Sequence, residues 1–124
     1  MTLTSRRFAN AVVLNAVGRL DQDTCDAFKG DLMSHVESSA RDGGAIVLDL
    51  SGLEYVSSAG LRCFMLASRQ AKSQQGRIVV AALQPMVQEI FEISHFNLVF
   101  QVFPTVREAV GAVSADAAAA FEKS

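Results

Sequence analysis

Two adjacent serines, Ser57 and Ser58, are the residues of this sequence whose type and position best suit a chemical role. They follow an apolar run and precede apolar residues at helical spacing (61, 64 and 65), so they are expected at the start of a helix. There a hydroxyl can cap free backbone N–H groups, and the positive end of the helix dipole can hold a phosphate. The residues alone leave both roles open.

A catalytic role for these serines is not supported by the rest of the sequence. A serine nucleophile needs a histidine base within hydrogen-bond reach, and the G-x-S-x-G elbow is absent. The two histidines, His35 and His95, fall late in one predicted helix and in a loop, and nothing places either beside Ser58. We therefore expect no catalytic residue and no enzymatic activity.

Metal and cofactor sites are also not expected. Cys25 and Cys63 are far apart, and neither belongs to a C-x-x-C pair, so they are interpreted as buried free thiols in a reducing compartment. The glycines fit turns and caps, and no G-x-G-x-x-G or Walker-type loop is present. The expected cofactor is none.

Composition limits the class of protein. The 124 residues are 50% hydrophobic and 19% charged with a net charge of −2, which indicates one globular domain, residues 1–124. The dispersed basic residues argue against nucleic-acid binding. No apolar run reaches the length of a membrane span. The basic start at 5–7 has the order of a secretory signal, but Asn10 and Asn15 interrupt the following apolar run, so a cytoplasmic location is expected.

Apolar periodicity predicts alternating strands and helices. Strands are expected at 3–8, 12–17, 45–48, 78–83 and 98–103, and helices at about 21–42, 58–75 and 85–94 and from 106 onward. The strand at 45–48 should leave the core at Asp49 and Ser51, and Gly43–Gly44 and Gly76 should stop helices. Thr105 and Glu108 have capping-box spacing, and residues 115–124 either extend the last helix or fray. The expected fold class is α/β: a small mixed sheet with helices packed mainly on one face.

Three stretches together resemble the anti-sigma factor antagonists of the STAS-domain family. They are IVLDLSGLEYVSSAGLRCFM, the upstream GRLD at 18–21 and FNLVFQVFPTVREAV at 96–110. The resemblance covers nearly the whole chain, and the combination is more specific than any one piece.

The resemblance implies a protein–protein switch. In this family an unphosphorylated antagonist binds an anti-sigma factor that is also a serine kinase of the GHKL ATP-binding type. Phosphorylation of one serine releases the complex, and a serine phosphatase restores it. The family motif D-S-S-G-L places Ser58 at the phosphoacceptor and Gly60 at the matching glycine, while Ser57 replaces the usual aspartate and is the second choice of acceptor.

Partner contacts are expected around this motif. The resemblance places Asp21 near the acceptor and Asp49 and Ser51 in the loop that leads to it, and Arg62 is expected to project near the serines. The expected partner-binding residues are Asp21, Ser51, Ser57, Ser58, Gly60 and Arg62. Two alternatives stay open: a non-phosphorylated STAS subunit of a transporter or lipid-trafficking complex, and a small ligand-binding domain or enzyme with an unrecognised site.

Overall fold

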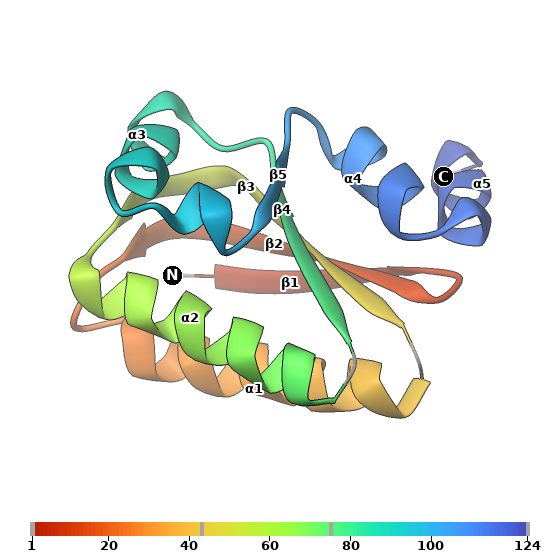
Figure 1. Cartoon of the computed structure of the whole chain (residues 1–124), viewed down its shortest axis with the longest axis horizontal. Helices are drawn as coiled ribbons and strands as arrows, with labels where there is room; N and C mark the ends of the chain where they lie inside the picture. Colours follow the sequence, from red (N-terminus) through yellow and green to blue (C-terminus); the bar gives the residue numbers. More distant parts are fainter. Residues whose placement is uncertain (1, 43, 75, 124) are drawn as a thin grey trace.

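A five-stranded sheet forms the centre of the molecule (Figure 1). The computed structural model describes residues 2–42, 44–74 and 76–123, so Gly43 and Gln75, expected at helix ends, lie outside the described residues. The strands follow the order of the sequence: β1 Thr2–Phe8, β2 Ala11–Leu20, β3 Ala45–Val56, β4 Arg77–Ala81 and β5 Gln101–Phe103. Among the described strands, only β1 is antiparallel to its neighbour, which confirms the expected mixed sheet.

Helices cover the two faces of the sheet unequally. They are α1 Cys25–Asp42, α2 Ser58–Ser73, α3 Pro85–Ile93, the 3₁₀ turn η1 Phe96–Leu98, α4 Val106–Val113 and α5 Ala115–Glu122. The first three and η1 pack on one face, and α4 and α5 pack on the other (Figure 1). Helix packing mainly on one face is therefore confirmed.

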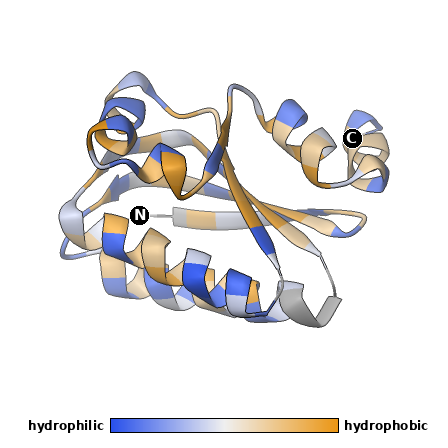
Figure 2. Ribbon diagram, in the orientation of Figure 1, coloured by the Kyte–Doolittle hydropathy of each residue, from blue (hydrophilic) through white to orange (hydrophobic). Residues whose placement is uncertain are grey.

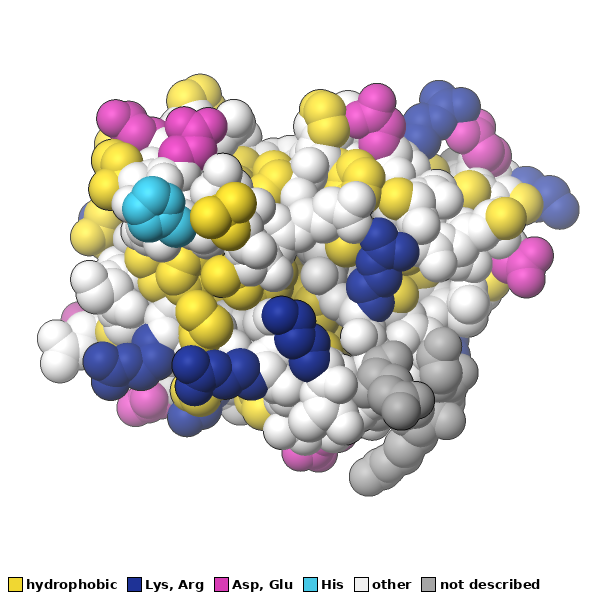
Figure 3. All heavy atoms as spheres, viewed as in Figure 1, with side chains coloured by type: hydrophobic (Ala, Val, Ile, Leu, Met, Phe, Trp, Pro, Cys, Tyr) yellow, Lys and Arg dark blue, Asp and Glu magenta, His cyan; other side chains and the backbone are white. Residues whose placement is uncertain are grey.

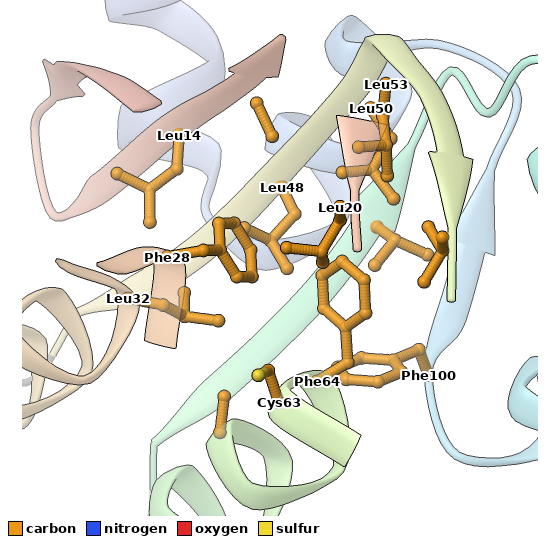
Figure 4. Packing of buried hydrophobic residues seen from close by; sticks show 14 of the residues in the cluster. Leu14, Leu20, Phe28, Leu32, Leu48, Leu50, Leu53, Cys63, Phe64 and Phe100 are labelled. Atoms are coloured by element: carbon orange, nitrogen blue, oxygen red, sulfur yellow. The ribbon is translucent and has the colours of Figure 1, made fainter. Parts of the chain in front are cut away.

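The larger core lies between the sheet and α1, α2 and α3. Apolar residues line the strands and the sheet-facing sides of the helices (Figure 2). Phe64 of α2 is fully buried at its centre, among leucines of β2, β3 and α1 (Figure 4). Its ring centroid lies 5.5 Å from Phe28, 5.9 Å from Phe91 and 6.2 Å from Phe100, each in an edge-on arrangement. Such aromatic contacts fix how α2 sits against α1 and α3.

The smaller core lies under α4 and α5. Thr105 caps α4 by accepting a hydrogen bond from the Glu108 N–H at 3.2 Å, as the capping-box spacing predicts. Beyond α4, Ser114 accepts a hydrogen bond from the Ala117 N–H at 3.1 Å and starts a separate helix, α5. Phe121 of α5 packs edge-on against Phe8 of β1, with ring centroids 5.2 Å apart.

Strand β3 is longer than predicted. The expectation that the chain leaves the core at Asp49 and Ser51 is wrong, since β3 continues to Val56 with Leu50 and Leu53 fully buried. The neighbouring β2 also runs on, to Leu20, and two register shifts keep the pair together. Such irregularities bend a strand without ending it, so β3 continues past the polar residues that interrupt its apolar pattern.

Two later strands are shorter than predicted. β4 ends at Ala81, and Ala82 adopts a left-handed backbone with φ of 59°. The last strand begins at Gln101, not at 98, because η1 occupies residues 96–98 and leaves Leu98 80% exposed. Phe100 instead packs into the aromatic core beside Phe96, with which it stacks.

Candidate functional site

The two serines occupy different positions at the start of α2. Ser57 is the N-cap: its backbone is extended and its Oγ accepts a hydrogen bond from the Gly60 N–H at 3.2 Å. The Ser57 N–H donates to the Leu20 carbonyl at 2.8 Å, which ties the helix start to the end of β2. Ser58 is the first helical residue and is exposed. The capping role therefore belongs to Ser57, and the Ser58 hydroxyl remains accessible.

Gly60 permits the close approach of α2 to the strand ends. A Cβ at this buried position would lie 2.7 Å from Leu20 Cγ and 3.1 Å from Val56 Cγ1. Real Cβ atoms essentially never lie as close as 2.7 Å to another heavy atom. The glycine in the motif is therefore required by packing, and it positions both serines.

Asp21 lies in the neighbouring loop between β2 and α1. Its Oδ1 accepts hydrogen bonds from the Asp23 N–H at 3.0 Å and the Thr24 N–H at 3.2 Å, and Thr24 Oγ1 accepts from the Asp21 N–H at 3.0 Å. These bonds shape the turn that starts α1. Because Asp21 follows Leu20 directly, this loop lies next to the Ser57 cap.

A groove of about 330 Å³ runs between α1 and α2 beside Ser58. Its lining comes from both helices: Cys25, Asp26 and Lys29 of α1, and Ser58, Ala59, Arg62, Cys63 and Leu66 of α2. The structure thus brings Ser58 and Arg62 together as expected. It adds Asp26 and Lys29 of α1, which lie outside the serine motif.

The two cysteines form the floor of this groove. Both are buried free thiols, as predicted, and the Cys63 Sγ–H donates to the Cys25 carbonyl at 3.5 Å. Burial raises the pKa of the Cys63 thiol, and the nearby Cys25 raises it further. The thiol is therefore protonated at neutral pH and contributes no charge to the groove.

Ser51 and Asp49 lie apart from Ser58. Five residues of extended strand, about 17 Å, separate Ser51 from the end of β3. Ser51 is exposed, and its carbonyl accepts a hydrogen bond from Gln84 Nε2 at 2.7 Å near the start of α3. Asp49 lines a cavity on the α4–α5 side of the sheet, with Val106 and Phe121. The structure therefore does not place these two residues in a loop leading to Ser58.

The described residues around the groove offer neither a histidine base nor a set of metal ligands. His35 lies ten residues beyond Cys25, about 15 Å along α1, and neither histidine lines the groove. Within residues 2–42, 44–74 and 76–123, no group of three His, Cys, Asp or Glu side chains could hold a metal ion. In the same part of the chain, no helix has the length and apolar character needed to cross a membrane.

The sequence matches a known protein family over most of its length. The family model described as "Mlab, STAS domain" matches residues 3–101. Over 112 residues, covering 90% of this chain and 93% of the relative, the sequence is 35% identical to the "Putative anti-sigma factor antagonist BtrV" of Bordetella bronchiseptica. The chain belongs to the STAS-domain family, among the anti-sigma factor antagonists, a class of regulatory proteins.

Solved structures share the fold at lower sequence identity. A "putative anti-sigma factor antagonist (tm1081)" from Thermotoga maritima superposes with a TM-score of 0.81 at 17% identity, covering 90% of this chain and 93% of that one. SpoIIAA of Bacillus has been solved unphosphorylated and phosphorylated. The unphosphorylated form superposes with a TM-score of 0.73 at 18% identity, covering 90% of this chain and 96% of that one. The phosphorylated form superposes with a TM-score of 0.67 at 17% identity, covering 91% of this chain and 100% of that one. The α/β fold is therefore that of the antagonists.

Proposed function

We propose that this protein is a cytoplasmic partner-switching regulator without catalytic activity of its own. Unphosphorylated, it binds an anti-sigma factor that is also a serine kinase of the GHKL ATP-binding type. The kinase transfers the γ-phosphoryl group of ATP to Ser58 Oγ: the new O–P bond forms, the bond to ADP breaks and the hydroxyl proton is released. The complex then separates, and a serine phosphatase restores the hydroxyl.

The exposure of Ser58 is the observation that supports this proposal. Ser58 and Ser57 are chemically identical neighbours, yet the Ser57 hydroxyl is occupied as the cap of α2 while Ser58 is exposed. A kinase can reach the Ser58 hydroxyl without breaking the start of the helix. SpoIIAA, which has the same fold, exists in a phosphorylated form.

Electrostatics explains how one phosphate could end the interaction. The modification adds about −1.5 to −2 charge, and the N-terminus of α2 tolerates a negative group in the free protein. A partner surface matched to a neutral hydroxyl would instead face a dianion stripped of water. Such a mismatch costs several kcal/mol, enough to change affinity by orders of magnitude without a large conformational change.

Binding measurements on charge variants test the switch. We expect Ser58→Ala to bind the kinase, identified by pull-down and mass spectrometry, as tightly as the wild type does, and Ser58→Asp to bind at least about 100-fold more weakly. Ser73→Asp is the matched control, because it adds the same charge at an exposed serine at the other end of α2. Equal affinity of Ser58→Ala and Ser58→Asp would exclude the phosphoswitch.

The state of the protein in its native cells provides a second test. Intact-mass and peptide analysis should find one phosphate, located on Ser58. A chain that is never modified and copurifies with a membrane transporter complex would instead favour a non-phosphorylated STAS subunit.

A further inference from the structure

The groove between α1 and α2 brings two cationic side chains to the same cavity as Ser58. Arg62 follows Ser58 by four residues on α2, a spacing that puts two side chains on the same helix face about 5–6 Å apart at Cβ. Lys29 reaches the cavity from α1. Lys and Arg side chains form a row along α2 in Figure 3, and hydrophobic side chains lie between this row and α3.

Neither cation has a carboxylate partner of its own. In the part of the chain that the structure describes, Arg62 and Lys29 make no hydrogen bond or ion pair, and both are exposed. Among the residues that the structure describes, Asp26 is the one acid that lines the groove, and the first turn of α2 carries no acidic residue. The Asp21 carboxylate in the adjacent loop accepts bonds from the Asp23 and Thr24 N–H groups. The charged side chains of the groove therefore sum to an excess of one positive charge.

We propose that this groove is an internal receptor for the phosphate on Ser58, with Arg62 and Lys29 as its counter-charges. The inference rests on the proposed function, because it concerns the phosphorylated state of the same serine. Arg62 can donate two parallel N–H bonds to phosphate oxygens, and Lys29 supplies a point charge from the other helix. Phosphorylation then adds an anion and also occupies the two cations of the groove, so neither stays free for an acidic group of a partner.

The protonation equilibrium of the phosphate reports directly on this pairing. A phosphoserine monoanion releases its second proton with a pKa of about 6, and nearby cations favour the dianion and lower that pKa. Phosphoserine can be placed at position 58 during translation, and a ³¹P NMR titration at low salt then measures the pKa. We expect the wild-type value to lie below that of a free phosphoserine peptide.

Three neutralising variants separate local pairing from overall charge. Arg62→Gln should raise the phosphate pKa by about 0.5 unit, and Lys29→Gln should raise it by a smaller amount. Arg69→Gln is the matched control: it removes the same charge from an exposed position seven residues further along α2, about 10 Å away and outside the groove lining. It should leave the pKa unchanged.

The proposal is overturned if Arg62→Gln and Lys29→Gln shift the pKa no more than Arg69→Gln does, which would mean that the phosphate points into solvent. The titration needs neither kinase nor partner. A failed pairing therefore leaves the binding result for Ser58→Asp intact, and a failed phosphoswitch leaves the titration interpretable.

Discussion

Replacing Gly60 by alanine should displace the start of α2. The protein should then be less stable than one with a Gly→Ala replacement at an uncrowded helix position. In a helix interior, Gly→Ala by itself stabilises by about 1 kcal/mol, because alanine restricts the unfolded chain and favours the helix. At Gly60 the new methyl group would lie 2.7 Å from Leu20 Cγ and 2.9 Å from Leu20 Cδ2. Leu20 is fully buried, so it cannot swing aside. Overpacking of this kind costs about 1–3 kcal/mol.

Gly30 provides the matched control for this substitution. It lies within α1, where an added Cβ meets nothing within 4 Å, so Gly30→Ala should stabilise the protein by about 0.5–1 kcal/mol. Urea unfolding should place the free energy of unfolding of Gly60→Ala about 1–3 kcal/mol below that of Gly30→Ala. This corresponds to about 0.5–1.5 M in the midpoint for a slope of about 2 kcal/mol/M. Equal stabilities of the two variants would refute the packing argument.

Two further predictions concern the same region. Ser57→Ala removes the acceptor for the Gly60 N–H and should lower the free energy of unfolding by about 1 kcal/mol, whereas Ser57→Asp, which can still cap, should keep most of it in the same urea assay. Native Cys63 should react with iodoacetamide at pH 8 much more slowly than in urea, because burial raises the pKa of its thiol above the usual range. Equal reaction rates in the native and the urea-denatured protein would contradict this expectation. The folded state also binds the thiol proton more tightly than the unfolded state does, so the thiol's contribution to stability should be lost as the pH rises through the folded pKa.

Local patterns predicted the elements whose determinants are local. The helix predicted from apolar periodicity at about 21–42 and the Thr105 cap both depend on residues within a few positions of each other, and both are confirmed. The extension of β3 could not be predicted in this way, because it depends on pairing with β2 across two register shifts. Phe100 belongs to the apolar run that predicted a strand at 98–103. In the structure, long-range contacts with Phe64 and Phe91 hold it outside β5.

The same distinction applies to the candidate site. Ser57, Ser58 and Gly60 occupy one helical turn, so the sequence could place them together. Lys29 belongs to another helix, and only the packing of α1 against α2 brings it to the groove. Ser114 is the signal that could have identified α5, because a serine before Ala-Asp-Ala has the form of a helix start.

The hydrogen bond from the Ser57 N–H to the Leu20 carbonyl has a consequence for substrate recognition. It makes the surroundings of Ser58 depend on a strand that lies far away in the sequence. A synthetic peptide spanning residues 52–64 would carry the same hydroxyl but would have little helix in water, since short isolated helices are marginal. An enzyme that acts on Ser58 would therefore recognise a folded surface and not a linear motif, and it would modify only correctly folded copies.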